Sequence, residues 1–403
     1  MTQPSPFQTP AFLHAQLRRD IAFFHPRTID PSGGFFHYLN DDGSIYDAAS
    51  RHLVNSARMV FCYALAFRLD GKEEYRDAVR HGLRFLEEKH KQAEYGGYAW
   101  VLENGIPVDR TQHCYGLAFV LLAHAHAFRI GISEAETGIS ATFELMERLF
   151  WSEADGLYAD EASPDGVVSP YRGQNANMHS CEALIAAFEA TADERYLHRA
   201  ELLARNITLR QAALGKGWIW EHYHSDWQVD WEYNRHDSSN MFRPWGYQPG
   251  HMTEWSKLLL LLERHRAHLQ HDGDWLLPRA QALFDVTMPL AWDAQYGGLH
   301  YGLAPDGTAC DDDKYFWVQA ESLATAALLA QRSGNAEYWD WYNKLWQYSV
   351  DHLIDPQQGG WYRILHRDNT RYGPEKPPHG KTDFYHPMGA CLESLHAVGC
   401  ALA

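Results

Sequence analysis

The segment GYQPGHMTEW, residues 246–255, places His251 and Glu254 three positions apart, directly after a Pro-Gly break. The apolar pattern KLLLLLERH that follows indicates a helix, so the pair falls on its first turn. We expect Gly250 to be the N-cap, with the helix dipole keeping His251 neutral and able to act as a base. Glu254 is then placed to fix the tautomer of the imidazole and to stabilise its cation. A plainer role for Glu254, as a carboxylate that stabilises the helix N-terminus, is compatible with the first.

A second histidine, His386, also lies at the start of an apolar segment. It directly precedes Pro387 in KTDFYHPMGACLE, and proline is favoured at the first position of a helix. The two histidines come from distant parts of the chain. They can therefore form a pair of acid/base catalysts that face each other across a cavity.

Polar or aromatic residues occur at the starts of all six strongly apolar segments. The set consists of Arg51, His52, His113, Tyr115, Asn177, His179, His251, Glu254, Trp317, Glu321 and His386. Each has a plainer explanation, because a single histidine or tryptophan in a helix is more often a core or surface group, and Arg51 can pair with a loop carboxylate. We take His124 and His126 to be such ordinary histidines. Six segments rarely carry such residues at the same position for packing alone, so the set predicts one shared site.

The segments that must position these residues have a helical period. Six are apolar nearly all round, which is typical of helices with protein on every side: 52–69, 112–130, 176–190, 251–265, 316–332 and 387–403. Amphipathic segments precede the loops between them, for example 73–90, 137–150, 194–207 and 337–353. The chain thus alternates between expected inner and outer helices.

Similar loop phrases recur at a spacing of about 60 residues, with one larger gap before the fifth. They begin at Gly33, Gly96, Asp155, Lys216, Gly297 and Gly359, and most combine glycine, alternating aromatic residues and a turn such as DDG, ENG or PDG. This form predicts a short hairpin or long loop in each of six repeats. Each loop leads into the N-terminal end of an inner helix.

Six outer and six inner helices close most simply into an all-α (α/α)6 barrel, a single domain over residues 1–403. A linear solenoid is the alternative, but the sequence shows no atypical capping repeat at either end. In the closed barrel, all six loops and all six inner-helix starts share one mouth. The candidate site residues therefore meet there.

Composition narrows the partners. Lys and Arg total 35 against 52 Asp and Glu, and the formal charge of -17 argues against a nucleic-acid partner.

The apolar run at 258–262 is too short to cross a membrane, and the N-terminus lacks a secretion signal, so we expect a cytoplasmic protein. The six scattered cysteines are interpreted as free thiols. With 15 Trp, 22 Tyr and 18 Phe, the chain has many aromatic rings that can stack on a sugar.

Several motifs that would each specify one kind of chemistry are absent from the sequence. There is no G-x-G-x-x-G, P-loop, H-E-x-x-H or G-x-S-x-G pattern, so nucleotide, zincin and hydrolase-elbow chemistry has no support. His222 and His224 alternate in WEHYHSD, which is a weak metal-binding signal. We therefore expect no metal.

The phrases SRHLVNSARM, DRTQHCYGLAF, QNANMHSCEAL, RPWGYQPGHMTEW, YFWVQAES and KTDFYHPMGACLE together resemble the N-acylglucosamine 2-epimerase superfamily. The likeness covers essentially the whole chain, and RPWGYQPGH and TDFYHPM are closest to its mannose isomerase and sulfoquinovose isomerase branch. The resemblance implies an (α/α)6 barrel without a cofactor, and acid/base histidines at His251 and His386. It also implies sugar-binding or supporting residues at Arg51, Asn177, His179, Glu254, Trp317 and Glu321, with looser matches at Tyr115 and Arg243.

The expected activity is an aldose-ketose isomerase that converts D-mannose to D-fructose through a cis-enediol. His251 is expected to move the proton between C2 and C1 and His386 to open the ring, although the opposite division stays open. Arg51 and His179 are the candidates to stabilise the enediolate oxygen.

Other activities also stay open. A 2-epimerase needs the same residues, and a sulfoquinovose isomerase would use Arg243 for the sulfonate. An (α/α)6-barrel glycoside hydrolase would use Glu254 and Glu321 as acid and base. A non-catalytic sugar-binding protein is the weakest of these alternatives. In each case the partner is a sugar, and the protein is a monomer or homodimer.

Overall fold

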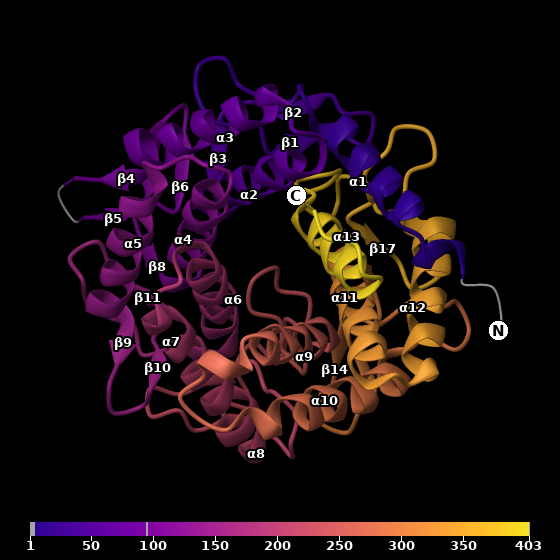
Figure 1. Cartoon of the computed structure of the whole chain (residues 1–403). Helices are drawn as coiled ribbons and strands as arrows, with labels where there is room; N and C mark the ends of the chain where they lie inside the picture. Colours follow the sequence, from indigo (N-terminus) through magenta and orange to yellow (C-terminus); the bar gives the residue numbers. More distant parts are fainter. Residues whose placement is uncertain (1–4, 94–95, 403) are drawn as a thin grey trace.

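The computed structural model describes residues 5–93 and 96–402, whose helices alternate between an inner and an outer layer of one ring (Figure 1). The inner helices are α2 (Leu53–Asp70), α4 (Cys114–Arg129), α6 (Gln174–Thr191), α9 (Pro249–Arg264), α11 (Phe316–Ser333) and α13 (Tyr385–Ala397). The outer helices are α1 (Pro10–Phe24), α3 (Glu73–Phe85), α5 (Ala135–Phe150), α7 (Glu194–Arg205), α10 (Leu276–Ala291) and α12 (Ala336–Tyr348). The expected (α/α)6 barrel is confirmed.

Short helical turns complete the outer layer. Three π-helical turns extend α3, α7 and α12: η2 (Leu86–His90), η3 (Asn206–Gln211) and η6 (Ser349–Leu353). The other short pieces are η1 (Pro6–Gln8), α8 (Ala212–Leu214), η4 (Arg266–His268) and η5 (Gly273–Trp275). The same irregular ending in three repeats supports the prediction that the chain is built from copies of one unit.

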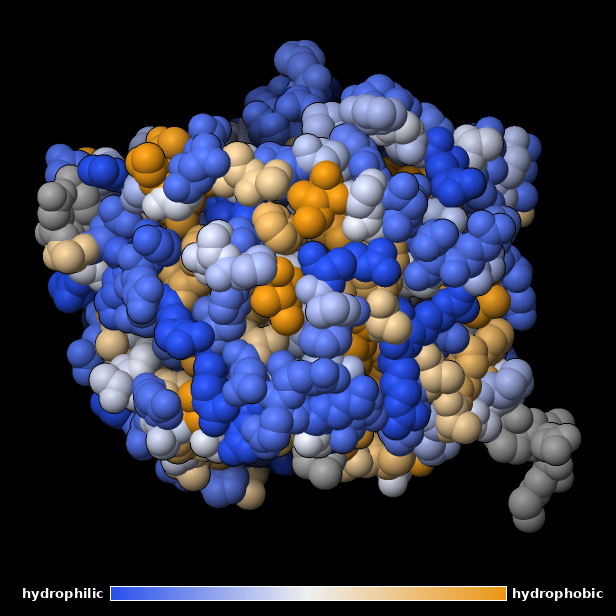
Figure 2. All heavy atoms as spheres, turned by 90° about the horizontal axis from the view of Figure 1, so that it is seen from above, coloured by the Kyte–Doolittle hydropathy of each residue, from blue (hydrophilic) through white to orange (hydrophobic). Residues whose placement is uncertain are grey.

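The two layers follow from the distribution of apolar residues. In α11, fourteen residues from Phe316 to Ala330 are buried, because the helix packs against α9, α12 and α13. In α3, by contrast, apolar residues such as Tyr75 and Val79 face inward while Glu73 and Glu74 meet water. The outer wall accordingly looks mostly hydrophilic, with scattered apolar side chains, on the side of the barrel that Figure 2 shows in a view turned by 90° from that of Figure 1. Burial of the apolar stripes therefore sets the order of the layers.

Short strands surround the starts of the inner helices. They are β1 (Tyr38–Leu39), β2 (Ile45–Asp47), β3 (Ser50–His52), β4 (Lys91–Gln92), β5 (Gly97–Tyr98), β6 (Val101–Glu103), β7 (Ile106–Asp109), β8 (Gln112–His113), β9 (Trp151–Ser152), β10 (Leu157–Tyr158), β11 (Glu161–Ala162), β12 (Arg172–Gly173), β13 (His222–Tyr223), β14 (Gly302–Leu303), β15 (Ala309–Asp311), β16 (Lys314–Tyr315) and β17 (Ile364–Leu365). Among residues 5–93 and 96–402, the eight sheets are all antiparallel and have two or three strands.

Each of the six loop phrases forms a hairpin or an antiparallel bridge, as predicted. In the fourth, Tyr223 pairs with Val229 across a turn that contains Trp227 at a φ of 62°. The corresponding turns in other repeats use glycine or asparagine in this conformation, for example Gly43 and Asn369. A tryptophan in the left-handed position explains why the fourth phrase looks different in the sequence.

Pairing between repeats closes the ring. The segment that leads into each inner helix pairs with the hairpin of the next repeat, as β3 does with β6, β8 with β11, β12 with β13 and β16 with β17. Tyr247 makes the same antiparallel bridge with Leu303. The last repeat pairs with the first, because Lys381 bridges Leu39. This sixth pairing excludes the linear solenoid.

The boundaries of two inner helices differ from those expected. Gln248 is the N-cap of α9 and Pro249 its first residue, because the fixed φ of proline suits that position, so Gly250 is not the N-cap. Helix α13 begins at Tyr385, which makes Pro387 its third residue rather than its first. It also ends at Ala397 instead of continuing to residue 403, since Gly399 adopts a φ of 79°.

Two other expectations concern cysteines and membranes. All six cysteines are free thiols, and four of them are buried. Within residues 5–93 and 96–402, no helix combines the length and the apolar character needed to cross a bilayer.

Candidate active site

One cavity of about 460 Å³ lies at the mouth of the barrel, and all six inner helices contribute residues to it. Seven of the predicted site residues line it: His52, Tyr115, His179, His251, Glu254, Trp317 and His386. Five do not belong to its lining: Arg51, His113, Asn177, Arg243 and Glu321. The starts of the inner helices thus converge on one cavity, and most of the predicted residues lie at it.

His251 is oriented by Glu221 and not by Glu254. Its Nδ1 lies 2.9 Å from Oε2 of Glu221, and because a carboxylate accepts, Nδ1 carries the proton. Gln174 donates to the same carboxylate at 2.9 Å, and its own amide is oriented by the indole N–H of Trp255. The proposed link between His251 and Glu254 is therefore wrong. Glu221 lies in the fourth loop phrase, next to His222, and was not among the predicted site residues.

His386 has the same arrangement on the other side of the cavity. Its Nδ1 lies 2.7 Å from Oε1 of Glu321, so this nitrogen is also the protonated one. Burial, reinforced by the nearby Arg58 guanidinium, holds the pKa of His386 well below its usual value. The ring is therefore neutral at physiological pH, with Nε2 free to accept a proton. Glu321 acts through His386 and does not line the cavity.

Trp317 lies between the two histidines. The centroid of its indole is 5.0 Å from the imidazole of His251 and 5.6 Å from that of His386. Gly250 makes this placement possible, since a Cβ at that residue would come within 2.3 Å of the indole. The lack of a side chain at Gly250 thus lets α9 approach Trp317 closely. This role of the glycine was not predicted from the sequence.

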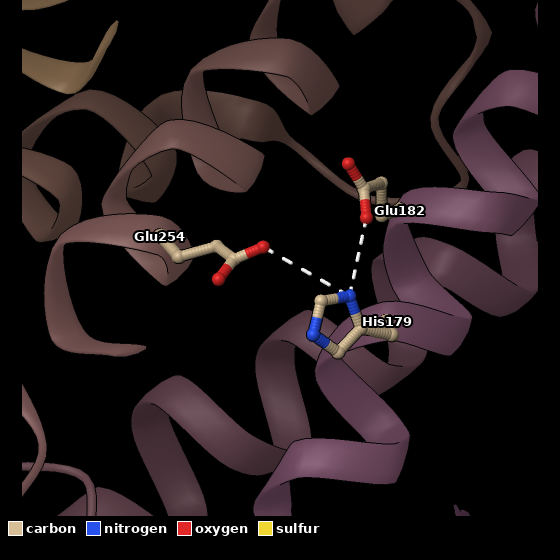
Figure 3. Close-up of side chains that lie close together, drawn as sticks. All are labelled: His179, Glu182 and Glu254. Carbon is tan, nitrogen blue, oxygen red and sulfur yellow. Dashed lines mark hydrogen bonds and ion pairs between the residues drawn. The ribbon is translucent and has the colours of Figure 1, made fainter. Parts of the chain in front are cut away.

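His179 lies between two carboxyl groups from different helices (Figure 3). Its Nδ1 is 3.2 Å from Oε2 of Glu182 on α6 and 3.9 Å from Oε1 of Glu254 on α9. Burial lowers the pKa of His179 to about 4. Burial and the neighbouring Glu321 raise the pKa of Glu254 well above its usual value, and neither of its buried oxygens has a hydrogen-bond partner in the protein. Glu254 is thus a neutral carboxylic acid that can donate a hydrogen bond into the cavity.

Arg51 does not reach the cavity. It pairs with Asp30 at 2.7 Å and donates to the backbone oxygens of Ala48 and Ser50. Arg172 makes the same two backbone contacts, to Ser169 and Tyr171, before α6. Strand β3 presents Arg51 and His52 to opposite faces, and His52 is the one that lines the cavity. The alternative expectation, that Arg51 pairs with a carboxylate in a loop, is therefore confirmed.

Arg58, on α2, lines the cavity together with Arg363 and was not among the predicted site residues. Its guanidinium lies 3.4 Å from Asp383, donates to Tyr115 and packs on the rings of Phe119 and Tyr385. Its position two turns into an otherwise apolar helix is the feature of the sequence that could have identified Arg58 as a candidate site residue. We assign to Arg58 the role expected of Arg51.

Asn177 is also structural. Its amide accepts from the backbone N–H of Tyr158 and donates to the backbone oxygens of Tyr158 and Gly173. Gln319 clamps the backbone of Leu299 in the same way in the fifth repeat. Asn175 lines the cavity instead. Two residues correspond to about 200° of rotation on a helix, so the two asparagines face opposite sides.

Arg243 lies outside the cavity lining and is already compensated. It pairs with Glu161, donates to Tyr233 and packs 3.8 Å above the ring of Tyr171. It therefore contributes no charge to the lining of the cavity. His124 and His126 are buried in the core, in agreement with the prediction.

His222 and His224 do not form a metal site. His222 is buried between the hydroxyl of Tyr171 and the backbone oxygen of Pro244, while His224 is mostly exposed.

Elsewhere among the described residues, two groups have ligand atoms within 4.8 Å of one another: His179, Glu182 and Glu254; and Glu254, Glu321 and His386. The ammonium of Lys257 lies 3.7 Å from Glu254, 3.9 Å from Glu182 and in hydrogen-bond contact with Glu321. It would repel a metal ion at either group, so this donor set fits a fixed ammonium better than a divalent cation.

The chain is similar over nearly its whole length to known proteins. The family model for N-acylglucosamine 2-epimerase (GlcNAc 2-epimerase) matches residues 34–390. The chain is 52% identical to a D-mannose isomerase of Marinomonas mediterranea, covering 98% of this chain and 99% of that protein. It is 33% identical to a D-mannose isomerase of Thermobifida fusca, covering 98% and 96%.

Solved structures agree with these relatives. A crystal structure of a D-mannose isomerase superposes with a TM-score of 0.93 at 51% identity, covering 98% of this chain and all of that one. The cellobiose 2-epimerase of Spirochaeta thermophila shares the fold at a TM-score of 0.85 and 24% identity, covering 96% of each chain.

Proposed function

The chain belongs to the N-acylglucosamine 2-epimerase family, and from that premise we propose that it is an aldose-ketose isomerase that converts D-mannose to D-fructose. One observation carries the proposal. Two histidines, each with Nδ1 bound to its own carboxylate, lie on either side of Trp317 in one cavity. The similarity to D-mannose isomerases over nearly the whole chain supports the choice of sugar.

The two histidines supply the proton transfers. Because Glu221 and Glu321 hold the Nδ1 protons, Nε2 of each ring is the nitrogen that can take a proton. One histidine opens the pyranose by moving a proton to the ring oxygen. The other removes the C2 proton to give the cis-enediol and returns a proton to C1. We assign C2/C1 transfer to His251 and ring opening to His386, and the test variants below include both.

A base alone is not enough to make the C2 proton of a sugar labile. A positioned base contributes about 10²- to 10⁴-fold, so the oxygen of the enediolate needs stabilisation as well. Arg58 supplies a positive charge that is held in place by Asp383 and two aromatic rings. Glu254, as a neutral acid, can donate a hydrogen bond from another inner helix. His179 donates its Nδ1 proton to Glu182, so its Nε2 can only accept and does not stabilise the enediolate oxygen. These groups need neither a metal nor a cofactor.

The competing activities have less support. Arg243 is paired with Glu161, which removes the reason for assigning it to a sulfonate. The carboxyl oxygens of Glu254 and Glu321 lie within 4.8 Å, whereas an inverting glycoside hydrolase places its carboxyl groups about 6.5–9.5 Å apart to admit water. A 2-epimerase would use the same two histidines and differs only in where the proton returns.

The remaining parts of the proposal rest on the sequence. Residues 1–403 are proposed to be one catalytic domain that acts on a monosaccharide, in the cytoplasm, as a monomer or homodimer. None of these parts alters the chemistry proposed for the cavity.

Proton NMR of D-mannose incubated with the enzyme in D₂O tests the activity. We expect fructose to appear with deuterium at C1. Glucose released from the earliest time points without fructose would instead establish a 2-epimerase. His251→Ala and His386→Ala are each expected to lower kcat by at least about 10²-fold. Near-normal turnover in both variants would contradict the assignment of the bases.

A further inference from the structure

Lys257 is a buried cation that the proposed reaction does not use. It lies one helical turn after Glu254 on α9, and its side chain is only 7% exposed. Its ammonium faces three carboxyl groups from three inner helices: Glu182 on α6, Glu254 on α9 and Glu321 on α11. Burial alone would lower the pKa of Lys257, but these carboxyl groups outweigh burial and raise it. The ammonium is therefore permanently charged.

Glu321 connects this ammonium to the catalytic histidine. Its Oε2 accepts from Nζ of Lys257, while its Oε1 accepts from Nδ1 of His386 at 2.7 Å. The two oxygens of one carboxylate thus serve two different partners. A change in the charge of Glu321 would pass directly to the imidazole.

The charge of Glu321 depends on Lys257. Burial raises the pKa of Glu321, and the nearest group that opposes this shift is the Lys257 ammonium, through both its charge and its hydrogen bond. Glu182, which also faces the pair, acts in the opposite direction and raises that pKa further. Among the described residues, the other charged or titratable groups around Glu321 and His386 include Glu254, His179, Arg58, Asp383 and Tyr385.

We propose that Lys257 is a positioning residue, whose ammonium keeps Glu321 ionised and so fixes His386 as the tautomer with a proton on Nδ1 and a free Nε2. Without the ammonium, the Glu321–His386 pair takes up a proton. We expect that proton on the ring or on Oε1, the carboxyl oxygen that faces Nδ1; in either place Nε2 carries a hydrogen and His386 no longer accepts one there. The catalytic consequence rests on the function proposed for His386, whereas the tautomer does not.

Nitrogen-15 NMR of histidine-labelled protein reports the tautomer directly. The His386 signals are assigned from their loss in His386→Ala. In the wild type at neutral pH, we expect an unprotonated Nε2 and a protonated Nδ1. In Lys257→Met, we expect the unprotonated Nε2 signal to disappear. Lys257→Gln repeats the measurement with a polar head group, in case the methionine variant does not fold.

Lys314→Met is the matched control. Lys314 is fully buried and pairs with Asp293 at 3.1 Å, so its loss also removes a buried ion pair, but it contacts neither Glu321 nor His386. This variant should lose thermal stability while keeping the wild-type tautomer of His386. An unprotonated Nε2 that persists in a folded Lys257 variant would overturn the proposal.

Measurements of turnover distinguish the role proposed for Lys257 from the isomerase function proposed for the protein. With D-mannose, Lys257→Met should lower kcat by about 10²-fold or more with little change in KM, and the acid limb of its pH profile should move to higher pH. If the wild type does not isomerise mannose but the tautomer changes as expected, the proposed substrate is wrong and the role of Lys257 stands. An unchanged pH profile in an active Lys257 variant would count against that role.

Discussion

Arg51 and Arg58 each pair with a carboxylate, but only Arg58 reaches the cavity. Asp30 and two backbone oxygens occupy the guanidinium of Arg51, whereas Arg58 lines the cavity. We expect Arg58→Met to lower kcat/KM for mannose by about 10²- to 10³-fold, the effect of losing one charge-stabilising donor. Arg51→Met should lower the melting temperature and leave kcat/KM within about threefold, as a structural role requires. Steady-state kinetics and thermal melts of both variants measure this contrast, and the opposite pattern would restore Arg51 to the site.

Glu221 is expected to matter for catalysis although it is not the acid next to His251 in the sequence. A glutamine at 221 removes the carboxylate that accepts the Nδ1 proton, so the ring can adopt the wrong tautomer. We expect Glu221→Gln to lower kcat on the order of 10²-fold or more with little change in KM. Glu254→Gln serves as the comparison, because it keeps the size of the side chain and leaves the contacts of His251 intact. If only Glu254→Gln altered the tautomer of His251 in nitrogen-15 spectra, our reading of the pair would fail.

The sequence identified residue types better than the direction of each side chain. His251, His386, Trp317 and His179 reach the cavity as expected. Asn177 does not, because its position differs by about 200° of helical rotation from that of Asn175. The side of a helix that a residue faces can be predicted from a sequence only when the first residue of the helix is known. The start of a helix is the least certain part of a prediction of secondary structure.

At the scale of the helix, Gly250 controls how closely α9 can approach Trp317. An added Cβ would come within 2.3 Å of the indole and 3.0 Å of Val318, so the ring must move in Gly250→Ala. Because Trp317 separates His251 from His386, we expect the variant to fold but to lose at least about tenfold in kcat/KM. Gly389→Ala on α13 is the matched control, since a Cβ there would have no atom within 4 Å. Equal activity in both variants would show that the position of Trp317 is not critical.

Helix periodicity predicted all six inner helices, but their connections were only partly predicted. The apolar pattern is local and repeats in every unit, so it could be read directly. The pairing of β3 with β6 joins residues about 50 positions apart, and no local signal specifies such a partner. The backbone clamps made by Asn177 and Gln319 were missed for the same reason, since each binds a loop from earlier in the chain.

At the scale of the molecule, ring closure was inferred from the lack of capping repeats, and the structure supplies the physical contact. Helix α13 packs against α11 on one side and against α1 and α2 on the other. It thus carries His386 to the cavity only if the first repeat is in place. A closed ring of this kind should unfold as one unit, because every repeat has two neighbours.

Matched leucines in two repeats can test the closure. Leu39 and Leu303 are fully buried, and each bridges its own hairpin to the segment that leads into an inner helix of the preceding repeat. The partner of Leu39 in that segment is Lys381, which comes from the other end of the chain. The partner of Leu303 is Tyr247, which comes from the repeat directly before it in the sequence. In a closed ring the two sites are equivalent. Leu39→Ala and Leu303→Ala should therefore each lower the free energy of unfolding by about 2–5 kcal/mol.

Urea unfolding followed by circular dichroism and by tryptophan fluorescence measures both variants. We expect one transition, coincident in the two signals, with a similar shift of the midpoint for each variant. If the repeats formed an open array, Leu39 would lie at a free end, where terminal repeats unfold independently of the rest. Leu39→Ala would then leave the main transition almost unchanged and add a separate early phase, while Leu303→Ala would shift the whole curve. Coincident and equal shifts are the outcome that the pairing of Leu39 with Lys381 requires.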